Sequence, residues 1–278
     1  MNLATRCARN LRFLSNLRGW RRVAQKLAPR DPHSSFRVKN RHGVHSGRMS
    51  DYIQRQLYLF GGYEQDEIDA FLSNIPLERH GVLLDIGANI GVHSIAFSRH
   101  FDRVIAFEPN PTLWADFVRM RADNEADNLA LVKCALGSEN GELPFFLVDN
   151  FNLGLGTLVQ DEQYDRPLKK AHDVPVRIGT EVLAEQGIGK VDVIKIDVQG
   201  FELEVMRGLA DIVERNRPII WMEFAEALHN TPKDQQLMQF LLQGRNLYQF
   251  LVRGSVLRRI ELRKIDGMPV TTGDYVII

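Results

Sequence analysis

The sequence predicts an α/β fold: a doubly wound, mostly parallel seven-stranded sheet of the Rossmann-like kind, with an N-terminal helical extension. Two observations support this prediction. From residue 82 onward, short apolar runs alternate with segments of helical periodicity, as expected for parallel strands joined by crossover helices. The first of these runs ends in a glycine-rich turn, at the edge where open α/β sheets bind their ligands.

Each element follows from a local pattern. Short apolar runs bounded by glycine, proline or polar residues predict strands at 82–86, 104–107, 129–136, 191–198, 218–224, 247–252 and 275–278. Residues 142–148 also have an extended pattern. Apolar residues at helical spacing predict helices at 64–74, 90–101, 111–124, 201–216 and 233–243. Residues 150–173 are polar and aperiodic, and we expect them to form a long loop over the ligand site.

The composition is that of an ordinary globular protein. The chain has 278 residues, 44% of them hydrophobic, which is enough to bury the core of one large domain. No run of about 18 apolar residues occurs, so the sequence predicts no transmembrane helix. Cys7 and Cys134 are too few for a disulfide framework or a zinc site, which favours a reducing, cytoplasmic location.

The charge is distributed unevenly along the chain. Residues 1–48 carry twelve Lys and Arg and one acidic residue, whereas the remaining 230 residues carry 23 basic and 34 acidic ones. We therefore expect a basic arm and linker over residues 1–48 and the main domain over 49–278, with a linker or small hairpins in 31–62. Residues 3–27 have the pattern of a basic amphipathic helix. Such a helix either packs on the domain or a second subunit, which we favour, or lies on the inner face of a membrane.

Polar residues at two successive strand ends predict a nucleoside site. At the first, glycine lets the backbone approach a ligand closely. The cofactor-binding residues expected there are Asp85, Gly87, Ala88, Asn89 and Gly91. The second strand ends at Glu108, before Pro109 and Asn110, and an acid at this place can accept hydrogen bonds from both ribose hydroxyls. The third strand ends near Cys134, expected as a small buried residue, and Ala135, at a position that borders the adenine ring in folds of this kind.

The charged residues of these motifs indicate which adenosine-containing ligand the site binds. A carboxylate at Asp85 suits a cationic amino-acid group and repels a pyrophosphate, which fits S-adenosylmethionine. A nicotinamide-dependent oxidoreductase would instead show a G-x-G-x-x-G turn without the preceding acid. Taken singly, the glycines could serve turn geometry, and Asp85 and Glu108 could serve as helix caps. Their joint spacing favours the ligand interpretation.

Four ordered motifs resemble those of the FkbM family of methyltransferases: Asp85–Gly91, Val104–Pro111, Lys195–Glu202 and Pro218–Phe224. The resemblance covers roughly residues 50–225. It implies a class I methyltransferase fold, S-adenosylmethionine as methyl donor and, usually, O-methylation of a hydroxyl on a sugar or natural product. At one position where this family usually has an acid, the chain has Gln199.

The third motif places candidate catalytic residues beside the donor. Asp197 ends its strand next to the first strand in the usual order of this fold, so it could position the acceptor hydroxyl, take its proton or touch the donor. Lys195 lies on the same side of the strand and is a catalytic candidate or an ion-pair partner of Asp197. Glu223 ends the next strand, and His229 beyond it is a possible general base. Asp197 and Glu223 could together hold a divalent metal, but two ligands do not define a site and we expect none.

The favoured interpretation is therefore an S-adenosylmethionine-dependent methyltransferase that acts on a hydroxyl of a small molecule or glycan. An RNA methyltransferase that uses the basic arm is an alternative, although the acidic body makes nucleic-acid binding unfavourable. A non-catalytic module that binds an adenosine ligand is a second alternative.

Overall fold

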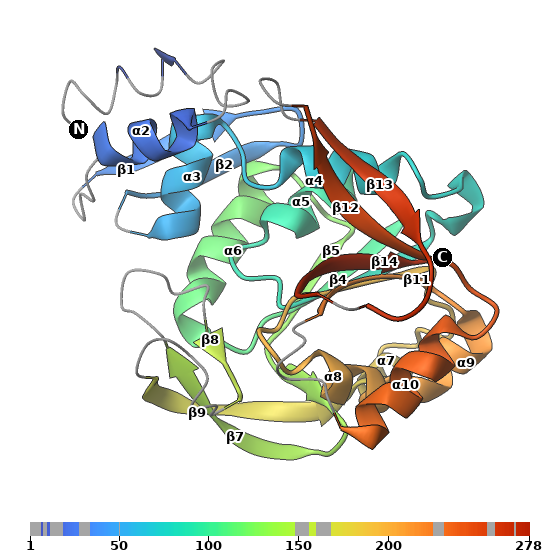
Figure 1. Ribbon diagram of the computed structural model, residues 1–278. Helices are drawn as coiled ribbons and strands as arrows, with labels where there is room; N and C mark the ends of the chain where they lie inside the picture. Colours follow the sequence, from blue (N-terminus) through green and yellow to red (C-terminus); the bar gives the residue numbers. More distant parts are fainter. Residues whose placement is uncertain are drawn as a thin grey trace.

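The computed structural model describes residues 7, 10–11, 19–27, 34–49, 51–147, 156–159, 168–224, 231–254, 259–269 and 271–278. Its largest feature is an eight-stranded sheet in the order β13-β12-β14-β11-β10-β3-β4-β5 (Figure 1). Five neighbouring strands are parallel: β11 (Ile219–Phe224), β10 (Val193–Ile196), β3 (Val82–Ile86), β4 (Arg103–Phe107) and β5 (Leu129–Val132). Three antiparallel strands extend the sheet beyond β11: β14 (Gly273–Ile277), β12 (Leu247–Arg253) and β13 (Arg259–Ile265).

This arrangement confirms the predicted α/β fold class, but the main sheet has eight strands where the sequence predicts seven. The additional strand, β13, lies at the edge of the sheet. Its residues alternate between exposed and half-buried positions, and four of its seven side chains are charged. Because an edge strand of this kind contains no continuous apolar run, the apolar pattern does not reveal it.

A second, four-stranded sheet has the order β6-β9-β7-β8, with β6 at Ala135–Gly137, β7 at Gly141–Leu147, β8 at Gly156–Thr157 and β9 at Lys169–Ile178. The predicted single strand at 129–136 is therefore wrong, because its two halves belong to different sheets. The predicted loop at 150–173 is wrong in part, since β8 and the start of β9 lie within it. Residues 148–155 and 160–167 lie outside the described residues. The first half of β9 is exposed and carries no apolar signal.

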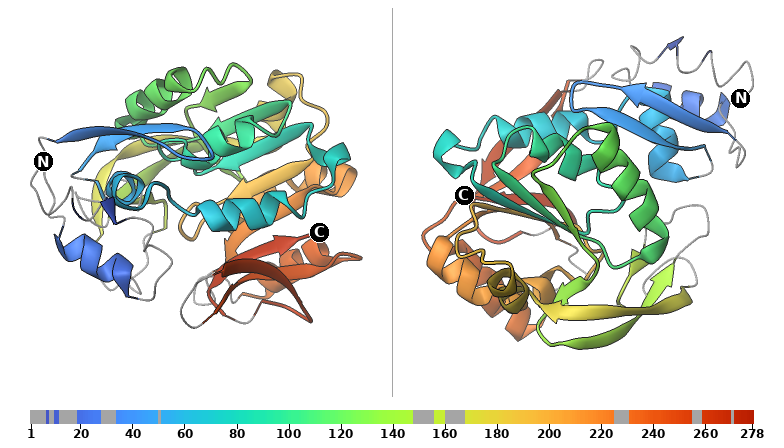
Figure 2. Two further views of the ribbon diagram at one scale, coloured as in Figure 1. Left: turned by 90° about the horizontal axis from the view of Figure 1, so that it is seen from above. Right: turned by 180° about the vertical axis from the view of Figure 1, so that it is seen from behind.

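Helices cover both faces of the main sheet (Figure 2). One face packs on α4 (Gln65–Leu72), α5 (Val92–Ser98) and α6 (Pro111–Asp123), and the other on α7 (Gly179–Glu185), α8 (Glu202–Gly208), α9 (Ala210–Asn216) and α10 (Pro232–Leu242). Successive strand residues alternate between the two cores: Leu83 belongs to the first and Leu84 to the second. The predicted helix at 201–216 is two helices. The first ends at Gly208, where a Cβ atom would lie 2.0 Å from the carbonyl oxygen of Gly137.

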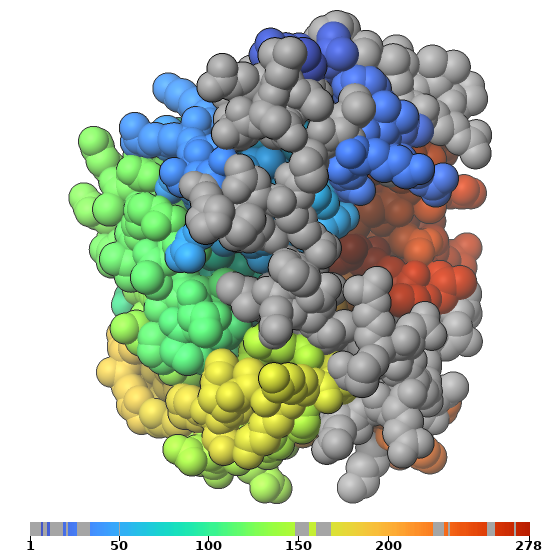
Figure 3. Space-filling view, turned by 90° about the vertical axis from the view of Figure 1, so that its left-hand side faces the viewer, coloured from blue at the N-terminus to red at the C-terminus, as the bar shows by residue number. Residues whose placement is uncertain are grey.

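The segment before the main sheet is more ordered than a linker. β1 (Ser35–Lys39) and β2 (Val44–Arg48) form the expected small hairpin, and the helix α3 (Tyr52–Phe60) follows it. The sequence pattern does not predict α3, whose start is fixed by Asp51 accepting a hydrogen bond from the Gln54 backbone at 2.9 Å. Figure 3 shows the hairpin, α6 and β9 following one another down one side of the molecule.

Part of the basic arm forms a helix that packs on the domain. This helix, α2 (Trp20–Leu27), contacts α3, and its Ala24 is fully buried. Most of the predicted helix at 3–27 lies outside the described residues, so contact of the arm with a membrane surface stays a prediction. Within the part of the chain that the structure describes, no helix has the length and apolar character needed to cross a membrane.

Gly87 sets the distance between two central strands at the ligand edge. Its φ of +81° is in the left-handed region, and a Cβ atom there would lie 1.9 Å from the carbonyl oxygen of Asp197, just beyond β10. A side chain at this position would therefore push the end of β10 away from the glycine turn.

We predict that Gly87→Ala destabilises the protein more than Gly187→Ala does. Gly187 also has a positive φ, of +67°, but has no neighbouring atom within 4 Å of its virtual Cβ. Its substitution should cost the backbone penalty of about 1–2 kcal/mol. Gly87→Ala should cost about 1–3 kcal/mol more, because the steric overlap adds to that penalty. Urea unfolding of both variants tests this, and equal losses would contradict it.

Candidate active site

The carboxyl ends of β3, β4 and β10 border a cavity of about 970 Å³, measured together with its open mouth. Its apolar lining includes Phe107, Leu113, Leu136, Phe145 and Phe201. Its polar lining includes Tyr63, His93, Glu108, Lys195, Asp197 and Gln199. The cavity therefore combines apolar walls, suited to a flat ring, with polar groups that can orient a ligand.

The glycine turn after β3 lies against the end of β4. The backbone N–H groups of Gly87 and Ala88 both donate to the Phe107 carbonyl at 3.0 Å. Asn89 has a φ of +55° and donates its backbone N–H to Oε2 of Glu108 at 2.8 Å. Gly87, Ala88 and Asn89 line the cavity, as the sequence predicts for cofactor-binding residues.

Glu108 is held from both sides. Its Oε2 accepts from Asn89, and its Oε1 accepts from the backbone N–H of Asn110 at 2.7 Å. Burial raises the pKa of Glu108 to about 7, although these two hydrogen bonds oppose the shift. Each carboxylate oxygen keeps a second lone pair, so the group can still accept hydrogen bonds from two neighbouring hydroxyls.

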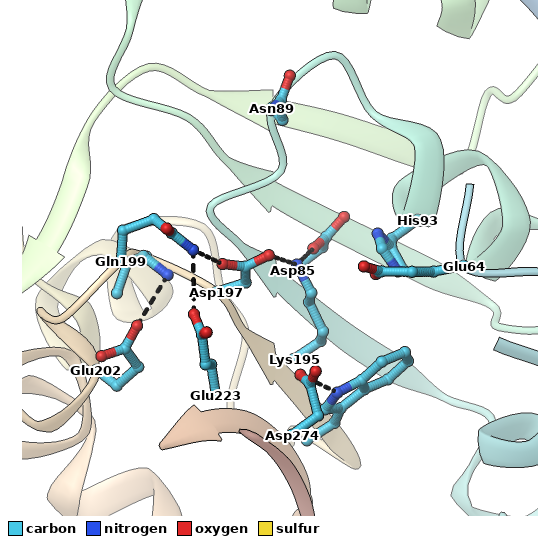
Figure 4. Close-up of polar contacts among 12 residues, drawn as sticks. Glu64, Asp85, Asn89, His93, Lys195, Asp197, Gln199, Glu202, Glu223 and Asp274 are labelled. Carbon is cyan, nitrogen blue, oxygen red and sulfur yellow. Dashed lines mark hydrogen bonds and ion pairs between the residues drawn. The ribbon is translucent and has the colours of Figure 1, made fainter. Parts of the chain in front are cut away.

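Lys195 is almost fully buried between two carboxylates (Figure 4). Its Nζ lies 3.6 Å from Oδ1 of Asp85 and 3.7 Å from Oδ2 of Asp197. Burial disfavours its charged form, but the carboxylates of Asp197 and Asp85 outweigh this effect and raise the pKa of Lys195. Asp85 is fully buried, accepts a 2.5 Å hydrogen bond from Ser94 and does not line the cavity. In this structure Asp85 is thus a partner of Lys195 behind the cavity wall.

Asp197 and Glu223 meet through Gln199. The Gln199 side-chain amide donates to Oδ1 of Asp197 at 2.7 Å and to Oε2 of Glu223 at 3.0 Å. Burial and the nearby Asp197 raise the pKa of Glu223 to about 8, so Glu223 is largely protonated near neutral pH. Within the described residues, no three His, Cys, Asp or Glu side chains are grouped so that they could hold a metal ion.

A polar group that the sequence analysis does not assign to the site comes from the segment before α4 and from α5. His93 is buried and lines the cavity, and its Nε2 lies 3.2 Å from Oε2 of Glu64. This contact lowers the pKa of Glu64, although burial opposes it. Tyr63 also lines the cavity, and burial together with the neighbouring Glu64 raises its pKa. Tyr63 and Glu64 precede the sheet and His93 follows the glycine motif by two residues, so their spacing in the chain does not show that they meet at the cavity.

Some of the remaining predicted residues line the cavity, and others only support the surrounding fold. Pro109, Cys134 and Ala135 line the cavity. Gly91 begins α5 with a φ of +88° and packs against the Phe117 ring, and Asn110 caps α6 by accepting from Thr112 at 3.1 Å. Glu223 lies behind Gln199 and does not line the cavity. His229 lies outside the described residues.

Residues 85–250 match the family described as the methyltransferase FkbM domain. The chain belongs to this family. The match contains the glycine turn, Glu108, and the Lys195, Asp197 and Glu223 group. It therefore confirms the resemblance of the four motifs and decides against a nicotinamide-dependent oxidoreductase.

Curated relatives are also methyltransferases. Methyltransferase sdnD of Sordaria araneosa is 30% identical over 194 residues, which cover 60% of this chain and 74% of sdnD. Hexuronic acid methyltransferase AglP of Haloferax volcanii is 27% identical over 151 residues, which cover 54% of this chain and 58% of AglP. The solved structure of methyltransferase FkbM from Methylobacillus flagellatus KT shares 15% identity and a TM-score of 0.43 over 83% of this chain and 53% of that one, too distant to place individual residues.

The donor of this enzyme is S-adenosylmethionine, and the cavity fits it. The apolar walls provided by Phe107 and Leu136 suit the adenine ring, and Glu108 has two fixed oxygens for the ribose hydroxyls. Asp197, whose side chain is 39% exposed, lines the same cavity. When bound, the donor supplies an electrophilic methyl group.

If Glu108 binds the ribose, donor affinity should fall as the pH falls through 7. With a pKa of about 7, roughly nine-tenths of Glu108 is ionised at pH 8 and roughly one-tenth at pH 6, and the ionised form is the better acceptor. The dissociation constant of S-adenosylhomocysteine should therefore be about tenfold larger at pH 6 than at pH 8 by isothermal titration. Glu108→Gln should bind more weakly and lose most of this pH dependence.

The matched control is Glu139→Gln, which removes an exposed carboxylate and should keep the wild-type affinity and pH profile. A profile that persists unchanged in Glu108→Gln would show that another group produces it.

Proposed function

We propose that this enzyme transfers the methyl group of S-adenosylmethionine to a hydroxyl oxygen of a small molecule, either a sugar or a hydroxylated natural product. The observation that carries this proposal is the placement of Asp197. Its carboxylate is partly exposed in the cavity, directly beyond β10 and against the glycine turn after β3. A carboxylate beside the donor can orient a hydroxyl group and accept its proton.

The neighbours of Asp197 support this role. Lys195 lies beside one of its oxygens and Gln199 donates to the other, so the carboxylate has a fixed orientation. An alkyl hydroxyl is a weak nucleophile, and its reaction depends strongly on alignment with the methyl group. Asp197 would hold the hydroxyl oxygen in line and receive its proton as the carbon–oxygen bond forms and the carbon–sulfur bond breaks, with S-adenosylhomocysteine as the leaving group.

Relatives as well as the cavity support this acceptor class. AglP is named for hexuronic acid, and a relative from Streptomyces tacrolimicus, 31% identical over 170 residues, is named 31-O-demethyl-FK506 methyltransferase FkbM. This chain spans 58% and 64% of these two proteins. Tyr63 and His93 add a polar cavity wall of the kind that binds hydroxylated molecules.

Labelled donor tests the reaction. The enzyme is incubated with S-adenosylmethionine carrying a ¹³C-methyl group and with a panel of glycosides, polyols and macrolide alcohols. Mass spectrometry and NMR should show the labelled methyl group on an ether oxygen. This methyl ether linkage should resist hydrolysis by mild alkali. A label found on nitrogen or carbon, or one released as an ester, would contradict the proposal.

Asp197→Asn separates catalysis from donor binding. With the best acceptor of the panel, the variant should lose about 10²–10⁴-fold in turnover, because an amide cannot take the proton. The affinity for S-adenosylhomocysteine should change by less than about threefold, well below the effect of one charge-assisted hydrogen bond. Equal losses in turnover and affinity would assign Asp197 to donor binding or to structure.

A further inference from the structure

Gln199 joins two acidic side chains that come from different strands. Its Nε2 lies 2.7 Å from Oδ1 of Asp197 and 3.0 Å from Oε2 of Glu223, and Figure 4 shows the amide between the two carboxyl groups. An amide –NH₂ group has two protons in fixed directions, so it can donate one to each carboxyl group. The amide can therefore bind both carboxyl oxygens at once, without rotation of either carboxyl group.

The backbone of Gln199 is held in the same place by contacts on both sides. Its φ of +55° is unusual for a residue with a side chain. Its carbonyl accepts a 2.8 Å hydrogen bond from the Thr157 hydroxyl. Glu202 accepts from the neighbouring backbone N–H groups of Val198 and Gly200, at 3.2 and 3.0 Å. The loop therefore presents the amide in one orientation, and its strain is offset by these hydrogen bonds.

We propose that Gln199 is a positioning residue for Asp197, and that its amide occupies the place a divalent cation would take between the two carboxyl groups. This inference rests on the proposed role of Asp197 toward the acceptor. With Gln199 on Oδ1 and Lys195 beside Oδ2, the carboxylate of Asp197 can rotate little. A glutamate at position 199 would put a carboxyl oxygen where Nε2 now lies 2.7 Å from Asp197 and 3.0 Å from Glu223, an arrangement that needs a shared proton or a bound cation.

Removal of the amide should change the surroundings of the Asp197 carboxylate. In Gln199→Ala, Asp197 loses the hydrogen bond to its Oδ1, so its carboxyl ¹³C resonance should shift at a fixed pH. Carboxyl ¹³C NMR measures this, with the resonance assigned from the Asp197→Asn spectrum. Gln236→Ala, at an exposed position of α10, should leave the Asp197 resonance unchanged. An unchanged Asp197 resonance in folded Gln199→Ala would overturn the positioning role.

Replacing Gln199 with glutamate, which has nearly the same shape but is an acid, tests whether the amide occupies the place of a cation. Gln199→Glu should bind Mn²⁺ at least tenfold more tightly than the wild-type enzyme does, as measured by loss of the free-ion electron paramagnetic resonance signal. Gln236→Glu adds the same charge on the surface of α10 and should match the wild type. Equal Mn²⁺ binding by Gln199→Glu and the wild type would overturn the inference. These readouts need no acceptor, so they are independent of whether the product is an O-methyl ether.

Discussion

The site depends on one buried ammonium group. Lys195 lies between Asp85 on the neighbouring strand and Asp197 at the end of its own, and the register pairs Lys195 directly with Asp85. Lys195 and Asp85 are both buried, and leaving either charge unpaired in the interior would cost about 3–5 kcal/mol. The pairing holds the carboxyl ends of β3 and β10 side by side, and the cavity opens at those ends.

The acidic side chains near Lys195 outnumber it, and three of them have raised pKa values. Burial and neighbouring carboxylates raise the pKa of Glu108 to about 7, of Glu223 to about 8 and of Asp274 to about 6. Concentrating acids in this way opposes folding, because each must lose its hydration or its charge. Perturbed pKa values gathered around one cavity are typical of a site shaped for chemistry.

Unfavourable backbone conformations are also concentrated around the cavity. Among the described residues, five non-glycine residues have a positive φ, and three of them, Glu64, Asn89 and Gln199, lie around the cavity. Each uses its conformation to place a polar group: Glu64 meets His93, Asn89 donates to Glu108, and Gln199 joins Asp197 to Glu223. Strain of this kind persists where surrounding contacts fix the backbone, as they do here.

The sequence by itself determined the central parallel strands, the glycine turn and the carboxylates at the strand ends, because apolar runs and glycine–acid spacing are local patterns. It could not reveal β13 and the exposed half of β9, which lack an apolar run, nor the division of 129–136 between two sheets. The tertiary structure alone placed Asp85 behind the cavity, brought Tyr63 and His93 into it, and set Gln199 between Asp197 and Glu223. These positions depend on contacts between residues far apart in the chain, and a short sequence pattern carries no information about such contacts.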